Sequence, residues 1–390
     1  MPDLLLFMPL KVPPRNDLVQ PLASWLDGDD QVGFQNSSFG GASDNQLQWV
    51  VPKPTFNSVD CRSELLRLAA LRNCLSENLQ DSHKSALEQN CLTDSQEYHA
   101  TLLEFEKRGF PTIDDELNGI ALTWKGAFSS TQQETHHSLV WDRVCTLWNV
   151  AAFQSFLASE ADLTKKEGCK LAISQSQTAS SNLAILRQLV ESEDYATVDV
   201  SQAMLSFWEK LLLAQGQLTI YKMANLGDTV RQHTTLAYLI QAAAGIYNEA
   251  LTWAQDPRLQ SEVPRQAQIW GAHCKAQSLV CQSRALFHLS IEHRLKQEHG
   301  LEIARIRQCV EQLREATKFC KSADLDLPEL QGLVTLAQDR LTRADEDNHK
   351  IYMDDVPKTL PEVRAQILVK KNLPLGTDMM ITKVRMFSWA

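Results

Sequence analysis

Proline is missing from a long central part of this chain of 390 residues. Seven of the fourteen prolines lie within the first 54 residues, and none lies in the 145 residues from 112 to 256. Proline inside a helix removes a backbone hydrogen bond and clashes with the preceding turn, so a long proline-free span permits helix throughout. The central part is therefore predicted to be a set of helices.

Apolar residues in this region and beyond it recur at steps of three, four or seven, which places them on one face of a helix. Four such stripes are Trp141, Cys145, Trp148, Ala152 and Phe156; Met204, Trp208, Leu211 and Leu218; Ile269, His273, Ala276, Val280, Phe287 and Ile291; and Ile303, Ile306, Val310, Leu313 and Cys320. Each stripe predicts a helix with one buried face. Helices of roughly 20 to 30 residues, paired as antiparallel hairpins, are predicted near 60–80, 134–158, 164–193, 198–224, 228–254, 262–296, 299–322 and 328–350.

The two ends of the chain have a different pattern. Short apolar runs at 4–10 and 47–51 predict strands joined by an irregular loop, and a third strand is predicted at 120–124, after a turn-like Asn-Gly pair. Prolines return at 357, 361 and 374, so roughly the last 35 to 40 residues are predicted to run as an extended arm over the helices.

Composition excludes several classes of protein. Apolar residues make up 44% of the chain, enough for a sizeable core, and the net charge of -10 argues against binding to nucleic acid. The chain carries no apolar stretch long enough to span a membrane and no secretory signal pattern, so peripheral membrane association is the most that is expected. The nine cysteines are odd in number and form no C-x-x-C pair, which indicates reduced thiols and a cytoplasmic protein.

Sequence signatures of enzymes are missing, since the chain has no G-x-G-x-x-G, Walker, G-x-S-x-G or H-E-x-x-H motif. The pair His273-Cys274 could open a phosphatase-like loop, but Val280 stands where the loop requires an arginine. A thiol-dependent hydrolase using Cys274 remains the enzymatic alternative. The histidines at 288, 293 and 299 are spaced by five and six residues, which does not place them on one helix face, so no metal site and no cofactor are predicted.

Several short motifs follow one another along most of the chain. They read Phe-Met-Pro-Leu-Lys at 7–11, Asp-Leu-Val-Gln-Pro-Leu at 17–22, Leu-Thr-Trp-Lys-Gly-Ala-Phe at 122–128, Val-Cys-Thr-Leu-Trp-Asn-Val-Ala-Ala at 144–152, Glu-Gly-Cys-Lys-Leu-Ala at 167–172, Leu-Ala-Gln-Gly-Gln at 213–217, Asp-Asn-His-Lys-Ile-Tyr at 347–352 and Val-Pro at 356–357. In this order they resemble the Bro-one domain of Alix-like endosomal sorting proteins.

The resemblance implies a mainly α fold, a curved TPR-like array of antiparallel helices with a small N-terminal β-sheet and an extended C-terminal arm. It implies one domain over residues 1–390, with strands and loops in 1–58, the helical array in 59–350 and the arm in 351–390. It also implies a non-enzymatic scaffold that binds the C-terminal amphipathic helix of an ESCRT-III subunit and is recruited to endosomal membranes. The chain is predicted to be a monomer because its apolar stripes can be buried within one helical array. A helical-repeat module for another peptide is the remaining alternative.

Residue by residue, the family's apolar pocket falls on Ile220, Thr235 and Leu239, with Leu368 from the arm and Lys170 at the edge. Thr235 stands where the family has an aliphatic residue. Tyr352 matches a family tyrosine that can be phosphorylated. If Leu239 lines a surface pocket, a charge placed there should block docking and leave stability nearly unchanged; if it is a core residue, the charge should unfold the protein.

Overall fold

The computed structural model describes residues 6, 8–11, 13, 58–80, 89–107, 120–129, 132–191, 193, 195–227 and 232–371. Its contacts group into two units, a larger one of residues 1–10 and 148–379 and a smaller one of residues 11–147 and 380–390. The boundary falls inside one continuous helix, α4 (Leu139–Ser159). The single domain expected over residues 1–390 stays a prediction.

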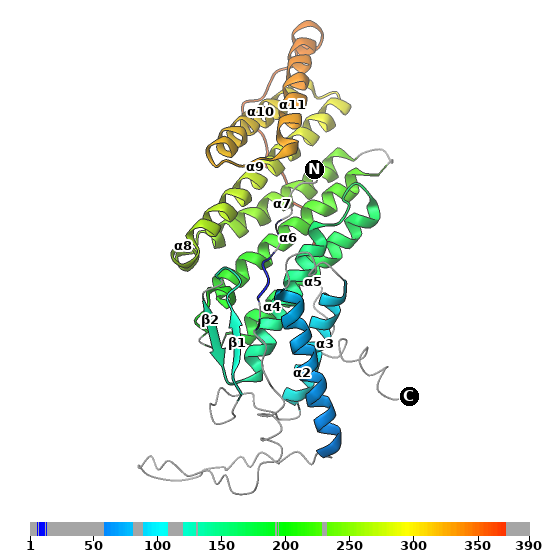
Figure 1. Ribbon diagram of the computed structural model, residues 1–390. Helices are drawn as coiled ribbons and strands as arrows, with labels where there is room; N and C mark the ends of the chain where they lie inside the picture. Colours follow the sequence, from blue (N-terminus) through cyan, green and yellow to red (C-terminus); the bar gives the residue numbers. More distant parts are fainter. Residues whose placement is uncertain are drawn as a thin grey trace, which may run out of the picture. The chain divides into compact units, whose positions relative to one another are not determined.

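The larger unit is a series of helices in which each packs on its neighbours in the sequence (Figure 1). After α4 come α5 (Lys166–Leu189), a 3₁₀ turn (Val198–Val200), α6 (Gln202–Asn225), α7 (His233–Ala254), the short α8 (Pro257–Glu262), α9 (Pro264–Leu295), α10 (His299–Ser322), α11 (Pro328–Asp347) and a π-helical turn (Asn348–Tyr352). Short connections make successive long helices antiparallel. The mainly α fold class is confirmed, and the predicted bounds of these helices hold to within a few residues.

Local sequence explains where several helices begin. Ser201 precedes α6, and its hydroxyl oxygen accepts a hydrogen bond from the Met204 backbone N–H at 3.2 Å, which satisfies one of the free donors of the first turn. Helices α8, α9 and α11 begin with Pro257, Pro264 and Pro328. Proline is well tolerated there, because a backbone N–H in the first turn of a helix has no partner within the helix.

Most residues of the predicted apolar stripes are buried, a few are half-buried, and one is exposed. Trp148, Trp208 and Leu313 are fully or almost fully buried, as are most other members of their stripes. Ile269, which the spacing assigns to the buried face of α9, is 47% exposed. It lies in the second turn of α9, and the adjacent Trp270 is buried in its place, stacked on Phe207 of α6 with ring centroids 5.0 Å apart.

The smaller unit contains α2 (Ser58–Gln80), α3 (Gln89–Lys107), and strands β1 (Leu122–Lys125) and β2 (Gln133–His136), which pair antiparallel with Leu122 opposite His136. Buried Asp142, in the first turn of α4, organises its core. Trp124 Nε1 donates to its Oδ1 at 2.5 Å, Arg72 pairs with it at 3.0 Å, and the Tyr98 hydroxyl donates to it as well. A buried carboxylate is tolerated here because several donors surround it.

For this unit, one prediction is confirmed, one needs correction, and one helix was not predicted. β1 confirms the strand predicted at 120–124. The helix predicted from residue 134 begins at Leu139, because residues 133–136 pair with β1 as a strand. Helix α3 was not predicted, although it carries a stripe that could have shown it, formed by Cys91, Ser95, Tyr98, Leu102 and Phe105, all buried.

The predicted N-terminal strands are not found within the described residues. Residues 6 and 8–10 form no strand; instead the Met8 backbone N–H donates to Ser155 Oγ at 3.0 Å, and Trp148 Nε1 donates to the Pro9 carbonyl oxygen at 2.9 Å. This segment is therefore fastened to α4. The strand predicted at 47–51 lies outside the described residues.

The C-terminal arm is confirmed over residues 353–371, which contain no helix or strand and lie against the helices. Arg305 of α10 donates to the Pro361 carbonyl oxygen at 2.6 Å, and the Gln366 backbone N–H donates to the Tyr238 carbonyl oxygen of α7 at 2.9 Å. Gly300 lets the arm pass close to α10, since a Cβ atom there would meet the Asp355 carbonyl oxygen at 2.1 Å.

Candidate docking site

Two of the five residues that the resemblance assigns to the pocket, Leu239 and Leu368, lie around one buried side chain, Gln217 of α6. Its Nε2 donates to the Leu239 carbonyl oxygen of α7 and to the Gln366 carbonyl oxygen of the arm, both at 3.0 Å. Its Oε1 accepts from the backbone N–H groups of Leu368 and Val369, also at 3.0 Å. The structure thus brings α6, α7 and the arm together at the place where the resemblance puts the pocket.

Helix geometry adds two further residues to this place. Ile220 is three residues after Gln217, and Thr235 is four residues before Leu239, so each shares a helix face with the residue that anchors the site. Thr235 is half-buried and its hydroxyl donates to Gln232 Oε1 at 3.1 Å. We call the surface formed by Ile220, Thr235, Leu239 and Leu368 the docking surface.

Exposure differs sharply within the docking surface. Leu368 is 44% exposed, whereas Ile220 is 9% and Leu239 only 3% exposed. Ile220 and Leu239 therefore form a floor, and Leu368 is the apolar group that stands above it. Because Leu239 is buried, a charged side chain at this position would lose its contact with water. We therefore expect a charge at Leu239 to lower stability, unlike a charge in an open surface pocket.

Lys170, which the resemblance puts at the edge of the pocket, is an exposed residue of α5. Its Nζ pairs with Glu167 Oε1 at 2.8 Å. Ser176, whose Cβ is 3.6 Å from the position of a Cβ on Gly216, marks where α5 faces α6, and Lys170 is about 9 Å along the helix from it. The place of Lys170 at the edge of the docking surface stays a prediction.

Sequence reasoning did not single out Gln217 or two exposed apolar neighbours, Leu171 on α5 and Ile367 on the arm. A signal for Gln217 was present, since it is one of the few polar residues in the mostly apolar stretch 211–220 of α6. A fully buried amide must find partners, and such a residue marks a place where another chain segment approaches. The partner, the arm, is about 150 residues away in the sequence and gives no local signal.

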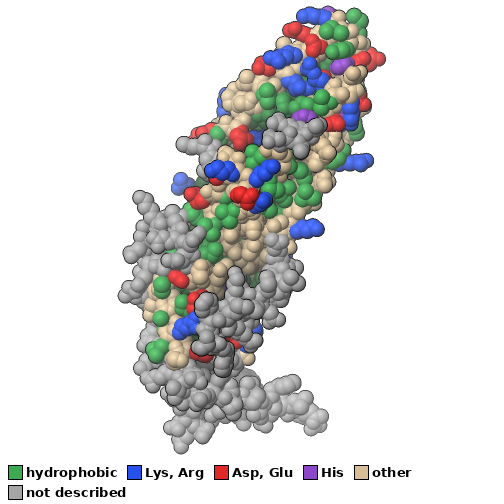
Figure 2. Space-filling model, turned by 90° about the vertical axis from the view of Figure 1, so that its right-hand side faces the viewer, with side chains coloured by type: hydrophobic (Ala, Val, Ile, Leu, Met, Phe, Trp, Pro, Cys, Tyr) green, Lys and Arg blue, Asp and Glu red, His purple; other side chains and the backbone are tan. Residues whose placement is uncertain are grey.

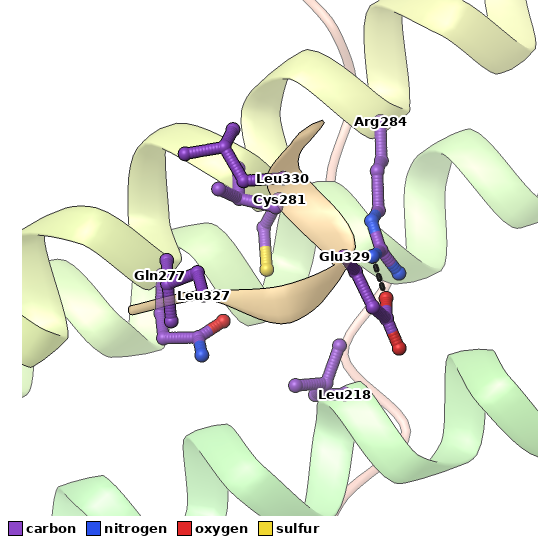
Figure 3. A pocket seen from close by; sticks show the side chains of 8 residues that line it. Leu218, Gln277, Cys281, Arg284, Leu327, Glu329 and Leu330 are labelled. Atoms are coloured by element: carbon purple, nitrogen blue, oxygen red, sulfur yellow. Dashed lines mark ion pairs between the residues drawn. The ribbon is translucent and has the colours of Figure 1, made fainter. Parts of the chain in front are cut away.

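A small pocket lies between α6, α9 and the start of α11 (Figure 3). Its volume of about 10 Å³ is close to the minimum for one water molecule. Glu329 closes one side through an ion pair with Arg284, and Lys222 Nζ approaches the same carboxylate to 3.8 Å. This pocket belongs to the attachment of α11 and is too small for a ligand.

A larger cleft of about 660 Å³ lies between the loop 160–164, the end of α6, and residues of α9 and α11. Its charged lining consists of Glu160, Asp162 and Glu329 together with Lys222 and Arg284. Hydrogen bonds from Lys165 and Thr164 lower the pKa of Asp162 to about 2, so that carboxylate is already well compensated. The mixture of charges selects no one class of ligand.

The enzymatic alternative rested on Cys274, which is buried in the middle of α9. Burial raises the pKa of this thiol to about 12, so the thiolate required of a nucleophile is strongly disfavoured at neutral pH. A phosphate-binding loop is not formed there, because the residues around it are helical. The geometry gives no support to catalysis at this residue.

The histidines considered for metal binding have other partners. The ring nitrogens of His288 form hydrogen bonds with Tyr221 Oη at 2.8 Å and with His233 Nδ1 at 3.1 Å. His293 pairs with Glu298 at 2.6 Å, and the His299 ring stacks on Tyr352 with centroids 3.5 Å apart. Within the described residues no group of three metal-ligating side chains occurs.

Tyr352, the predicted phosphorylation site, stands at the end of the π-helical turn and is partly exposed.

On the face shown in Figure 2, basic and acidic side chains are interspersed over the described part of the chain. None of the described helices is both long and apolar enough to cross a membrane.

Comparison with known proteins places this fold. The family model for the BRO1-like domain matches residues 45–388. The chain belongs to the BRO1-like domain family. It is 27% identical to the programmed cell death 6-interacting protein of Xenopus laevis over 95% of this chain and 39% of that protein, and 27% identical to the vacuolar-sorting protein BRO1 of Arabidopsis thaliana over 75% of this chain and 35% of that one.

Solved structures agree with this membership of the BRO1-like domain family. One, described as an ALIX BRO1 CHMP4C complex, has a TM-score of 0.76 and 22% identity and covers 94% of this chain and 95% of its own. Another, described as a basis for endosomal targeting by the Bro1 domain, has a TM-score of 0.74 and 18% identity over 95% and 93%. These likenesses show the fold. The BRO1-like chain spans about two fifths of the length of the first curated relatives it matches.

Proposed function

We propose that this BRO1-like chain is a non-catalytic, monomeric adaptor that binds the C-terminal amphipathic helix of an ESCRT-III subunit on its docking surface. In this role it acts in the cytoplasm and is recruited to endosomal membranes. The observation that carries the proposal is Leu368, an exposed leucine held beside Leu239 by hydrogen bonds of the arm to Gln217. An amphipathic helix recognises such a place by inserting its apolar residues between fixed apolar groups.

The composition of the docking surface supports this kind of partner. Leu368 and Ile367 on the arm and Leu171 on α5 are exposed apolar side chains of the segments that meet at or next to this surface. Exposed apolar side chains of this kind are typical of protein–protein contacts when they form one patch. Relatives support the partner class, since one structure of the same fold is a complex with CHMP4C.

The test is the binding of a fluorescent CHMP4C C-terminal peptide, measured by anisotropy. Leu368→Asp places a charge under the docked helix, and we expect affinity to fall at least tenfold, with the melting temperature changing little because Leu368 is exposed. Leu336→Asp is the matched control, since Leu336 is an exposed leucine on α11. Wild-type protein that does not bind the peptide, or equal losses in the two variants, would contradict the proposal.

A further inference from the structure

The segment of the arm that completes the docking surface has little apolar packing of its own. Between Glu362 and Lys370, Val369 is the only buried residue and Val363 is half-buried, while the others are exposed. Apolar burial therefore contributes little to holding this segment. Something else must determine where Leu368 stands.

Backbone groups of helices supply little for that purpose, although the Gln366 backbone N–H does donate to the Tyr238 carbonyl oxygen of α7 at 2.9 Å. Each N–H and C=O in the interior of α6 is used within the helix, so a segment lying across it finds no ladder to join, as it would at the edge of a sheet. A side chain must supply the missing donors and acceptors. Gln217 does so, and it is fully buried.

The amide of Gln217 uses its complete hydrogen-bonding capacity, two donors on Nε2 and two acceptor positions on Oε1. Nε2 donates to the carbonyl oxygens of Leu239 and Gln366, and Oε1 accepts from the backbone N–H groups of Leu368 and Val369. Each of the four distances is 3.0 Å. Turning the amide by 180° would set its NH₂ group against two N–H donors and its oxygen against two carbonyls. The arrangement therefore specifies one register of the arm.

Close packing at the neighbouring residue reinforces that register. A Cβ atom on Gly216 would lie 3.1 Å from Val369 Cγ2, so glycine at this position lets the arm settle directly on α6. Lys371 then pairs with buried Glu209, about two turns before Gly216 on α6. Leu368 is thus fixed between two anchored neighbours, with its own side chain left exposed.

We propose that Gln217 is the positioning residue of the docking surface: its amide holds the arm in the one register that sets Leu368 over the floor formed by Ile220 and Leu239. This inference deepens the proposed function and rests on it. Gln217 is buried and does not contact the partner. It acts through Leu368. A substitution of Gln217 would therefore displace Leu368 on the arm and weaken the apolar contact between Leu368 and the partner.

Gln217→Leu removes the four hydrogen bonds at nearly constant volume. We expect the affinity for the CHMP4C peptide to fall about tenfold and trypsin to cleave faster after Arg364 and Lys370. Because Gln217 acts through Leu368, the double variant with Leu368→Ala should bind no more weakly than Gln217→Leu alone. Asn182→Leu is the matched control, since it breaks another buried amide pair, with Gln154 at 2.9 Å, that includes no residue of the arm.

A second variant separates positioning from general damage. Gln217→Glu keeps an acceptor for the two arm N–H groups, but as a carboxylate it faces the Leu239 and Gln366 carbonyl oxygens with a second negative oxygen. Protonation restores a donor toward them. The ratio of variant to wild-type affinity should therefore recover as the pH falls from 7.5 to 5.5, whereas that of Gln217→Leu should stay constant.

Should Gln217→Leu fail to fold, Val369→Ala loosens the arm from the opposite side and should likewise speed cleavage and weaken binding. Unchanged arm cleavage in the folded Gln217 variants, or additive losses in the double variant, would overturn the inference while leaving the proposed function intact. Arm release without any peptide binding by the wild type would instead contradict the proposed function alone.

Discussion

Helix α11 and the C-terminal arm are neighbours in the sequence but are attached to the larger unit in opposite ways. α11 sets Leu330 and Ala337 into an apolar cluster with Ile306, Val310 and other residues of α9 and α10. Ion pairs at its periphery, such as Arg340–Glu302 at 2.7 Å, are additional. The arm buries one valine fully and is held mainly by polar contacts, three of which are hydrogen bonds to the Gln217 amide.

The difference teaches how each segment responds to change. Apolar contacts are non-directional and spread over many atoms, so no single residue decides whether α11 stays in place. Hydrogen bonds are directional, and a buried amide that loses its partners is costly. The position of the arm therefore depends on a few directional hydrogen bonds, whereas that of α11 depends on many apolar contacts. Directional bonds suit a segment that presents a leucine to a partner.

The largest effect is expected at Trp148, which sets the scale for the dry helical core. It is fully buried on α4 and its Nε1 donates to the Pro9 carbonyl oxygen. Trp148→Ala should lower the free energy of unfolding by about 3–5 kcal/mol. Denaturation with urea measures this value. An unchanged transition midpoint would show that the dry core does not supply the stability assigned to it.

An intermediate effect is expected at Leu313, a member of the apolar cluster that holds α11. Leu313→Ala should cost about 2–4 kcal/mol because it leaves a cavity between α10 and α11. Since that attachment is distributed, α11 should remain in place in the native state, and hydrogen exchange in residues 363–371 should keep its wild-type protection under native conditions. Selective deprotection of the arm by Leu313→Ala would break the contrast between the two segments.

The sequence predicted the helices because their stripes are local, and it predicted the arm because prolines forbid helix beyond residue 356. It missed α3 although the stripe through Tyr98 was present, and it placed a strand at 4–10, where the backbone is instead bound by Ser155 and Trp148. An apolar run of that length does not distinguish a strand from a segment packed on a helix.

The docking surface could be placed only through the family resemblance, because its parts come from residues 220, 235, 239 and 368. The resemblance did not predict that Ile220 and Leu239 of the docking surface are buried while Leu368 is exposed. That difference depends on which groups the arm covers, and this depends on hydrogen bonds between residues about 150 positions apart. Spacing within one helix carries no information about them.

The smallest expected effect concerns Thr235, the polar member of the docking surface. Its hydroxyl is already satisfied by Gln232, so the threonine presents a methyl group and a hydroxyl at a place where an apolar partner would dock. Thr235→Val keeps the shape and replaces the hydroxyl by a methyl group, which should raise affinity for the CHMP4C peptide roughly two- to fivefold, about 0.5–1 kcal/mol, from added apolar burial. Thr234→Val, one residue earlier on α7 and on a different face, is the matched control and should leave affinity unchanged. If Thr235→Val lowers affinity instead, the threonine hydroxyl contacts the partner directly, and this side of the docking surface recognises a polar group while the arm side presents Leu368.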